Sequence, residues 1–357
     1  MIETKKILTK ITDIYKPPIR DSNSIKLNLN ETQFIDETLF NKIISKIDID
    51  KITHYPEYEE LMNSLEKYCG TNKNEILVTN GAAQGIDLVL RTFTPKKKVV
   101  IVMPNFNHYE AAAKYEGVTL KKVFYTKDFE FPVDKILKQI TSSIDGIILC
   151  NPSNPIGSLI PDNFIKQILD KAKEHKKFVL IDEVYFEFSK VTYSSYLKKY
   201  KNLIILRSFS KGFALAGLRI GYILSSKNNI LELEKTKGPW DINSISVLFA
   251  IEVLKKKNLI IGKLLKVKNE IIVFLKNRNL KVLDSDTNFI TFEIKNSKLF
   301  TKKLSSHGIL VSELTDYLSS NNLLTNYIRL GIPSEENKEQ VLKVFSKVMD
   351  SMNIKLK

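Results

Sequence analysis

Cysteine is scarce in this sequence, and long apolar runs are absent. Only two of the 357 residues are cysteines, Cys69 and Cys150. Two cysteines cannot build a disulfide framework or, by themselves, a metal site, so we expect a protein of the reducing cytoplasm without a structural metal. Met1 to Lys5 lacks the apolar stretch of a signal peptide. No later segment approaches the roughly 20 apolar residues of a membrane-spanning helix, so we expect no association with membranes.

Acidic residues are outnumbered by basic ones. The chain has 55 Lys and Arg against 40 Asp and Glu, a formal net charge of +15. The lysines are scattered, and their densest runs, Lys96–Lys98 and Lys255–Lys257, are typical of solvated edges. No motif that reads nucleic-acid bases accompanies them. We therefore expect no nucleic-acid partner, and we attribute the charge to composition and to an attraction for anionic ligands.

Apolar strands alternate with amphipathic helices over the first two thirds of the chain. A hydrophobic content of 43% with 27% charged residues indicates a globular protein, and 357 residues favour two domains. The β-α alternation predicts an α/β fold, in which a large domain has a mostly parallel sheet, right-handed crossovers and helices on both faces. We expect its strands at residues 75–79, 99–103, 118–124, 146–150, 178–182, 203–206 and 221–224.

The last third of the chain has a different pattern. A long amphipathic stretch predicts two helices, broken near Asn258, that lead into a smaller α+β domain. Its strands are expected at residues 281–283, 288–294, 309–311 and 327–330, and its helices at 298–306 and 335–352. Near the N-terminus, Pro17-Pro18 predicts an extended arm, and residues 27–31 predict a short strand that runs into a polar turn. The chain then divides into an N-terminal arm with part of the small domain (1–50), a large domain (51–255) and a small C-terminal domain (256–357).

One loop places a lysine where ligands bind in open α/β sheets. The strand that ends at Arg207 is followed by Ser208 to Gly221, a loop that contains Lys211 and Arg219. An amine at the carboxyl end of a strand, partly desolvated and near another cation, has a lowered pKa and can form a Schiff base with a carbonyl group. Judged alone, Lys211 could equally be a surface lysine. The residues predicted at neighbouring strand ends favour a reactive centre.

Further candidates are expected at the same edge of the sheet. Asn151 leaves its strand in a rigid loop with two Asn-Pro steps, and Asp182 ends a run of four apolar residues, where an unpaired carboxylate is costly. Asp182 could instead cap a helix or form a structural ion pair. Tyr109 lies at a strand-to-helix junction and could stack on a flat ligand. The small residues Ala82 and Ala83 leave a helix start open to a phosphate.

Two candidates have strong alternatives. Tyr55, in a loop beside a proline, could pack on the following helix or contact a ligand. Arg329 lies within an apolar strand of the small domain, where it could be exposed at an edge or could clamp a carboxylate with two hydrogen bonds.

Taken in order, these motifs resemble those of a known family. Asn-Pro-x-Asn-Pro-x-Gly begins at Asn151, Asp-Glu-x-Tyr at Asp182, Ser-x-Ser-Lys at Ser208 and Gly-Leu-Arg-x-Gly at Gly217. From about Leu27 onward the chain resembles the fold-type I, aspartate-aminotransferase-like enzymes, and most closely their histidinol-phosphate aminotransferase branch. The resemblance implies pyridoxal 5′-phosphate, which draws electrons from the substrate α-carbon while a carboxylate keeps its ring nitrogen protonated.

The resemblance also implies a role for each candidate. Lys211 would carry the cofactor and move a proton at the substrate α-carbon, Asp182 would bind the ring nitrogen, and Tyr109 would stack on the ring. The residues implied to hold the ring hydroxyl or the phosphate are Asn151, Tyr185, Ala82, Ala83, Ser208, Ser210 and Arg219, with Tyr55 reaching in from a second subunit. That last role implies a homodimer with composite sites. Arg329 would bind the substrate carboxylate, and Asn30-Glu31, with Asn151, would line the substrate pocket.

One segment departs from the histidinol-phosphate branch. In that branch an arginine that grips the substrate phosphate usually follows the segment equivalent to Gly308–Val311, but here Ser312-Glu313 follows. A carboxylate there is expected to repel a phosphate. This predicts a substrate other than histidinol phosphate, unless Arg20 or a nearby lysine replaces the arginine.

Three functions follow from these motifs. The first is a pyridoxal-phosphate-dependent aminotransferase acting on a small, anionic or phosphorylated amino or oxo compound, with glutamate as donor. The second is a decarboxylase of a phosphorylated amino acid such as phosphoserine or phosphothreonine, in which Arg329 would hold the carboxylate that leaves. The third is a binding protein that keeps the fold without the chemistry, which the joint presence of Lys211 and Asp182 disfavours.

Overall fold

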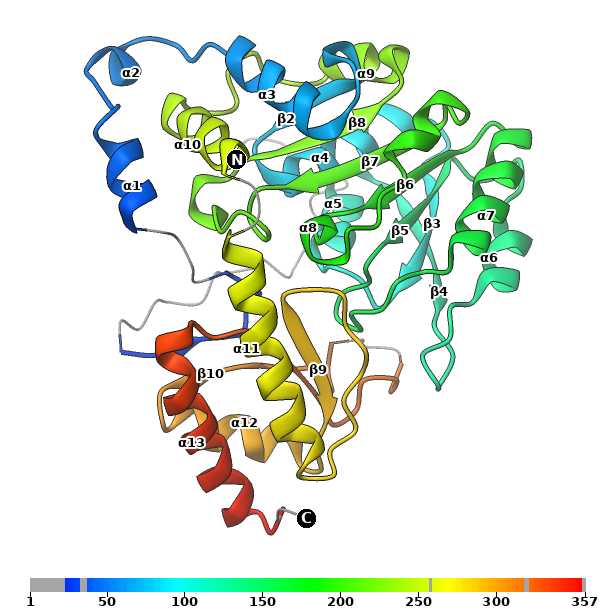
Figure 1. Cartoon of the computed structure of the whole chain (residues 1–357). Helices are drawn as coiled ribbons and strands as arrows, with labels where there is room; N and C mark the ends of the chain where they lie inside the picture. Colours follow the sequence, from blue (N-terminus) through cyan, green and yellow to red (C-terminus); the bar gives the residue numbers. More distant parts are fainter. Residues whose placement is uncertain (1–22, 33–36, 257–258, 318–320, 355–357) are drawn as a thin grey trace, which may run out of the picture.

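A seven-stranded sheet forms the centre of the protein (Figure 1). We describe it from a computed structural model, in residues 23–32, 37–256, 259–317 and 321–354. The strand order is β2-β8-β7-β6-β5-β3-β4; the pairs from β7 to β4 are parallel, and β8 runs antiparallel to both of its neighbours. The strands are β2 (Ile76–Thr79), β3 (Lys98–Met103), β4 (Thr119–Phe124), β5 (Gly146–Cys150), β6 (Phe178–Asp182), β7 (Leu203–Ser208) and β8 (Gly221–Ser225). Every strand expected in this region is present.

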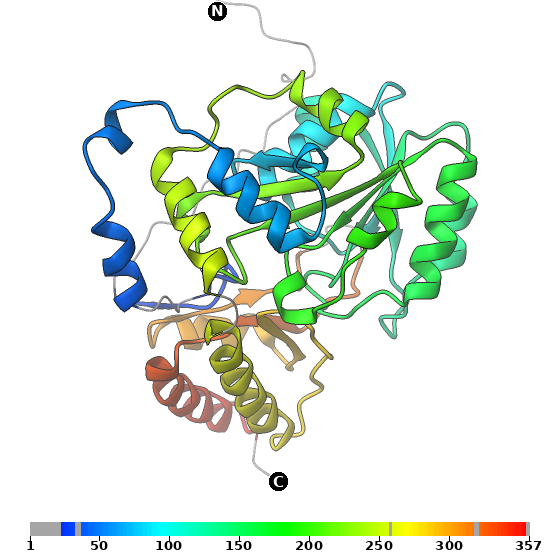
Figure 2. The ribbon, with the colours of Figure 1, turned by 45° about the horizontal axis from the view of Figure 1, so that its top comes forward.

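Helices cover both faces of this sheet because apolar side chains alternate along the strands. Val100 and Val102 belong to one buried core, and Val99 and Ile101 to the other. Figure 2 shows the sheet between its two helical layers. The first core packs α1 (Glu37–Ile44), α3 (Glu59–Cys69), α6 (Val133–Gln139), α7 (Asp162–Glu174) and α10 (Ser244–Lys255). The second packs α4 (Gly81–Phe93), α5 (His108–Glu116) and α9 (Lys227–Glu234).

A smaller α+β unit follows in the chain and lies below the large sheet in Figure 1. Its strands form a three-stranded antiparallel sheet, β11-β12-β9, and a parallel pair, β1-β10. The elements are β1 (Ile25–Lys26), α11 (Leu259–Lys276), β9 (Phe289–Glu293), α12 (Ser297–Ser305), β10 (Ile309–Leu310), β11 (Ser312–Glu313), β12 (Tyr327–Gly331) and α13 (Glu335–Ser351). A third core joins these elements, and the predicted fold class is confirmed.

Two predicted strands are wrong. The strand expected to start at Leu27 lies earlier in the chain, at Ile25–Lys26, whereas the polar turn expected after it is present at Asn30, whose φ is 53°. Residues 281–283 form no strand; only Val282 makes an isolated bridge, to Phe292.

Several short elements have no counterpart in the predictions. They are α1, β11, α2 (Asp50–Thr53), α8 (Phe186–Ser189) and the 3₁₀ turns Lys73–Glu75, Ser194–Lys198 and Ala216–Leu218. Apart from α1, each is too short to show the periodicity on which such predictions rest.

Some predictions fall on parts of the chain outside the described residues. These are the arm at Pro17-Pro18, Arg20 and the helix break at Asn258. Within the described residues, no helix combines the length and the apolar character needed to cross a bilayer.

Candidate active site

Lys211 lies just past the carboxyl end of β7 and is half-buried. Among the described residues, its Nζ donates hydrogen bonds only to backbone carbonyls, that of Asn30 at 3.0 Å and that of Leu29 at 3.2 Å. Burial, then Arg329, lower the pKa of Lys211 from 10.5 to about 8, against the opposing attraction of Glu31. A substantial fraction of this amine is therefore unprotonated near neutral pH.

Asp182 ends β6, the strand beside β7, and is 3% exposed. Its Oδ2 accepts a hydrogen bond from the Tyr109 hydroxyl at 2.9 Å, and its Oδ1 accepts one from the Val184 amide at 3.2 Å. Burial raises the pKa of Asp182 to about 6, although these hydrogen bonds and the Lys211 charge lower it. Lys211 and Asp182 therefore share one edge of the sheet, and each charge favours the other.

Tyr109 and Asn151 flank this pair. Tyr109 is fully buried, and burial, with the Asp182 charge, raises its pKa well above the usual value, so the phenol stays protonated as a donor. The Asn151 Oδ1 accepts from the Ile160 amide at 2.7 Å, while its buried Nδ2 makes no hydrogen bond among the described residues. An unsatisfied buried amide next to Asp182 marks a place where an acceptor is missing.

The start of α4 and the loop after β7 pack closely against each other. A Cβ added at Gly81 would lie 2.7 Å from the Arg219 guanidinium, and one added at Gly221 would lie 2.9 Å from the Ala82 amide. Arg219 is exposed and donates to Ser210 Oγ at 3.5 Å. Guanidinium, hydroxyl and helix amides together suit an oxyanion such as a phosphate.

Two further predicted residues belong to these two segments. The Ser208 Oγ accepts a hydrogen bond from the Ser210 amide at 3.1 Å, which orders the turn before Lys211. Ala83 follows Ala82 in the first turn of α4 and is half-buried.

The segment Leu27–Thr32 crosses over the lysine. The Asn30 side chain donates to the Tyr185 hydroxyl at 3.1 Å, and Thr32 Oγ1 donates to the Lys211 carbonyl at 2.8 Å. Asn288 holds this segment by donating to the Asn30 carbonyl at 2.9 Å and to Thr32 Oγ1 at 3.1 Å. The predicted turn Asn30-Glu31 therefore does border the site.

Arg329 reaches the site from β12 and is 9% exposed. Its Nη1 donates to Asn154 Oδ1 at 2.9 Å, and its Nη2 donates to the Asn28 carbonyl at 2.7 Å and to Ser312 Oγ at 3.1 Å. All of these acceptors are neutral, and Nε has no partner among the described residues. The guanidinium is fixed in place and keeps its full charge for an anion.

Glu313 does not face Arg329, contrary to the expectation that it would oppose a substrate anion there. Ser312 pairs with Arg329 across β11 and β12, so the next side chain, Glu313, points to the opposite face. There its Oε1 accepts hydrogen bonds from the Ser297 hydroxyl at 2.5 Å and from the Thr315 amide at 3.2 Å.

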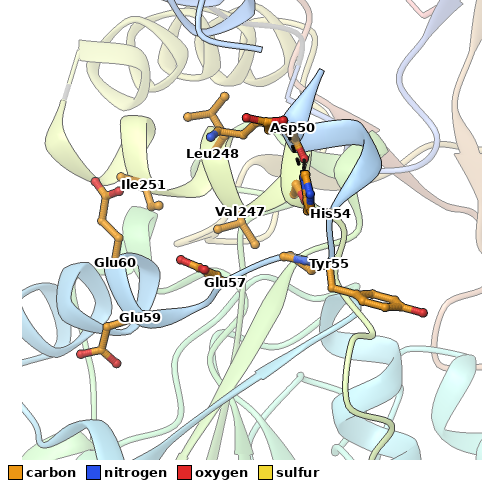
Figure 3. A pocket seen from close by; sticks show the side chains of 12 residues that line it. Asp50, His54, Tyr55, Glu57, Glu59, Glu60, Val247, Leu248 and Ile251 are labelled. Carbon is orange, nitrogen blue, oxygen red and sulfur yellow. Dashed lines mark hydrogen bonds and ion pairs between the residues drawn. The ribbon is translucent and has the colours of Figure 1, made fainter. Parts of the chain in front are cut away.

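Tyr55 lies away from Lys211 within its own chain. It is 73% exposed and stacks on Trp240, with ring centroids 4.2 Å apart. It borders a hollow between α2 and α10, and Figure 3 shows its side chain directed away from the other labelled residues of this hollow. Arg20, the remaining predicted site residue, lies outside the described residues.

Three residues of the site escaped prediction from the sequence. Thr32 and Asn288 carry no motif that could have revealed them. Asn154 belongs to the quoted Asn-Pro motif but was given no role. In the part of the chain that the structure describes, no cluster of three or more His, Cys, Asp or Glu could hold a metal.

The groups of the site that lack hydrogen-bond partners show whether the predicted cofactor fits it. Among the described residues, Asn151 Nδ2 lacks an acceptor and Lys211 Nζ has only carbonyl partners, and the Arg219 guanidinium packs closely on Gly81 at the start of α4. A flat aldehyde with a phosphate arm supplies a partner for each of these groups. The residues present therefore fit pyridoxal 5′-phosphate.

Comparison with known proteins identifies the family. The family described as "Aminotransferase class I and II" matches residues 22–345. The chain belongs to this family. It is 30% identical over 338 residues to the histidinol-phosphate aminotransferase of Caldanaerobacter subterraneus subsp. tengcongensis. The aligned region covers 91% of this chain and 93% of that protein.

Solved structures share the fold. A histidinol-phosphate aminotransferase from Sinorhizobium meliloti in complex with pyridoxal-5′-phosphate superposes with a TM-score of 0.83 at 20% identity, over 98% of each chain. The L-threonine-O-3-phosphate decarboxylase of Porphyromonas gingivalis superposes with a TM-score of 0.75 at 22% identity, over 91% of this chain and 99% of that one. The predicted family, fold and enzyme class are confirmed, and pyridoxal 5′-phosphate is the cofactor of this family.

Proposed function

We propose that this aminotransferase moves an amino group between glutamate and a small, anionic or phosphate-bearing substrate at the site around Lys211. The observation that carries the proposal is the pairing of Lys211 and Asp182 at neighbouring strand ends, with Arg329 beside them. When bound, the cofactor supplies an electron-withdrawing ring that weakens the bonds at the substrate α-carbon.

Each side chain has a proposed part in holding the cofactor. Asp182, with a pKa of about 6, is ionised at neutral pH and would hold a proton on the ring nitrogen. Tyr109 keeps the Asp182 carboxylate oriented and would also lie against the ring. The groups that would hold the ring hydroxyl or the phosphate are Asn151, Tyr185, the Ala82 and Ala83 amides, Ser208, Ser210 and Arg219.

Lys211 is the group that would move a proton. With a pKa of about 8, its amine can take a proton from the substrate α-carbon and give it back without a large energetic cost in either direction. Arg329 would bind the substrate carboxylate, and its neutral neighbours Asn154 and Ser312 fix the direction of the guanidinium. Asn30-Glu31 and Asn151 would line the rest of the pocket.

The substrate is proposed from the relatives. The curated relatives are named histidinol-phosphate aminotransferases, so a phosphorylated amino compound is the proposed class. Because Glu313 faces α12, it does not stand against a phosphate near Arg329.

A half-reaction tests this function. Holoenzyme mixed with L-glutamate should lose the absorbance of the aldehyde form of the cofactor and release 2-oxoglutarate. The other amino substrate is found by mixing fresh aldehyde-form holoenzyme with histidinol phosphate, phosphoserine and phosphothreonine in turn, because each true substrate should cause the same loss of absorbance and form its own oxo product. If no donor in a broad amino acid panel gives either signal, the proposal is wrong.

The alternative is decarboxylation of a phosphorylated amino acid. The decarboxylase with a similar structure is 22% identical, so it supports a shared fold and does not favour its reaction. Release of carbon dioxide from phosphothreonine or phosphoserine, without an oxo-acid acceptor, would favour this alternative over amine transfer.

The lowered pKa of Lys211 predicts a pH dependence. Only the unprotonated amine attacks an aldehyde, and lowering the pKa from 10.5 to about 8 raises that fraction at pH 7 to about one in ten. The rate at which apoprotein captures pyridoxal should therefore rise with pH and level off above a midpoint near 8. Stopped-flow absorbance measures this rate. In Arg329→Gln the midpoint should move upward, because the Arg329 cation lowers the pKa of Lys211. A midpoint near 10 in the natural protein would contradict the prediction.

We further propose a homodimer with composite sites. Ile49, just before α2, and Ile52 within it are 75% and 67% exposed, and the nearby Tyr55 points outward. Exposed apolar side chains gathered on one segment favour an interface. A second copy would cover this segment and bring its Tyr55 to the phosphate-binding residues of the first.

Negative charge introduced at Ile49 and Ile52 should separate the subunits. The chain has a mass of 41.0 kDa, and sedimentation should give twice that value for the natural protein. The double variant Ile49→Asp with Ile52→Asp should sediment as a monomer and lose cofactor, because burying two carboxylates opposes association. Leu299→Asp, at a similarly exposed apolar position on α12, should remain dimeric. A natural protein that sediments as a monomer at micromolar concentration would contradict the dimer.

The domain boundaries and the cellular location of the protein are also proposals. We propose residues 51–255 as the large domain, 256–357 as the small domain, and 1–50 as an arm shared with the small domain, which the β1-β10 pairing supports. Leu39 and Ile43 of α1, however, pack in the first core of the large sheet. Two free cysteines support a cytoplasmic location, which fractionation of the source cells would test.

A further inference from the structure

Glu187 is a buried acid directly beneath the lysine loop. It belongs to α8 and is 3% exposed. Its Oε1 accepts a hydrogen bond from the Tyr68 hydroxyl at 3.3 Å, whereas its buried Oε2 has no partner among the described residues. A Cβ added at Gly212 would lie 2.4 Å from the Glu187 Cβ and 2.7 Å from Oε2. The carboxyl therefore packs on the backbone of the residue that follows Lys211.

The nearest cation does not pair with Glu187. Arg207 makes its ion pair with Glu183, at 2.7 Å, and donates to the Thr192 hydroxyl at 2.7 Å. Its guanidinium also lies 3.6 Å from the Phe186 ring centroid. The titratable groups that face Glu187 are Tyr68 and Cys69 from α3, Lys190 at the end of α8, Arg207 from β7 and Tyr222 from β8. None of them forms an ion pair with it.

Tyr68 links the acid to the far side of the same loop. Its ring makes an edge contact with Phe213, with centroids 5.7 Å apart, while its hydroxyl reaches Glu187. Glu187 and Tyr68 together therefore contact both residues that follow Lys211. We propose, on the basis of the function proposed above, that Glu187 is a positioning residue for Lys211 and acts with a neutral carboxyl packed against the Gly212 backbone.

Ionisation of this carboxyl should loosen the loop. Burial raises the pKa of Glu187 from 4.5 to about 7, against the attraction of Arg207. Since the pKa in the folded protein lies above the unfolded value of about 4.3, the neutral acid contributes its full stability below about pH 4, and this contribution is lost as the pH rises through 7. Above that pH an unpaired charge is buried beside Gly212, and Lys211 should hold the cofactor less well.

Neutral and truncated variants separate positioning from a structural role. Glu187→Gln keeps the shape without the charge, so its cofactor dissociation constant should match the natural protein at pH 6 and be about tenfold tighter at pH 8.5. Glu187→Ala should bind about tenfold more weakly at both pH values. Glu252→Gln, at another buried acid that is ion-paired with Lys46 and Lys255, should behave as the natural protein. Equilibrium dialysis of apoprotein against pyridoxal 5′-phosphate gives these constants.

Two further measurements keep the test decisive. Urea unfolding of apoprotein should give Glu187→Gln a higher midpoint than the natural protein at pH 8.5, and this difference should shrink as the pH falls toward 4. Gly212→Ala should weaken cofactor binding as Glu187→Ala does, and Gly262→Ala, at a glycine with open space around it, should not. Identical pH profiles for Glu187→Gln and the natural protein would overturn this inference, whereas a natural protein that binds no cofactor would overturn the proposed function itself.

Discussion

Replacing Lys211 by alanine is expected to lower kcat for amine transfer by at least about 10³-fold, because the group that moves the proton is removed. The loop itself should survive, since Thr32 binds the Lys211 carbonyl and not its amine. The variant should therefore fold normally and bind the cofactor only through its phosphate and ring contacts. Glutamate half-reactions followed by absorbance measure the rate, and circular dichroism checks the fold.

Two companion variants make this result specific. Lys211→Arg keeps a cation at the loop but has no amine that can attack an aldehyde, so it should be as inactive as the alanine variant. Lys227→Ala, at an exposed lysine on α9, should retain full activity. Borohydride should fix the cofactor to the natural protein and to Lys227→Ala only. An active Lys211→Ala would show that another lysine carries the cofactor.

Replacing Asp182 by asparagine is expected to lower kcat by about 10²–10³-fold, the usual effect of removing one fixed electrostatic partner from an active site. Asparagine fills the same space and can keep the hydrogen bond from Val184. It has no negative charge to hold a proton on the ring nitrogen, so the loss should fall on kcat rather than on the substrate KM. Steady-state kinetics with glutamate resolve the two constants.

The pH profile separates this effect from a packing defect. In the natural protein, activity should fall as the pH drops through about 6, where the Asp182 carboxyl becomes protonated. The asparagine variant should lack this fall. Tyr109→Phe removes one hydrogen bond to Asp182 and should cost only about tenfold. If Asp182→Asn and Tyr109→Phe lost equal activity, and if both still lost activity below pH 6 as the natural protein does, the proposed role of the Asp182 charge would be contradicted.

The strand-end residues were predictable because a local rule applies to them. Parallel strands end at one edge of a sheet, so Asp182, after four apolar residues, and Lys211, after the next strand, were expected to meet. The structure brings them together as expected. Arg219 and the start of α4 follow the same logic, since each adjoins a strand end.

The segment Leu27–Thr32, which crosses over Lys211, was not predictable in this way. Thr32 lies 179 residues from Lys211 in the sequence, and Asn288 lies 258 residues from Asn30. Neither forms part of a periodic pattern, and the sequence predicted the turn at Asn30 but not the segment's contact with Lys211. Contacts of this kind depend on how segments distant in sequence pack together, which no local spacing predicts.

Side-chain direction was also left to the structure. Ser312-Glu313 suggested a carboxylate near the substrate anion, yet the pairing of Ser312 with Arg329 turns Glu313 to the far face. A shift of one residue in register would have reversed that outcome. Glu187 is a similar case, because its sequence neighbours give no sign that it packs on Gly212.

The sequence by itself determined the family, the order of strands and helices around the large sheet, and the reactive lysine with its partner acid, because each is encoded in a short stretch of chain. Only the tertiary structure decided which side chains surround that lysine, which way β8 runs and which face Glu313 occupies. The physical reason is that docking and register are set by the packing of surfaces that are distant in sequence, and their free energy is shared among many weak contacts.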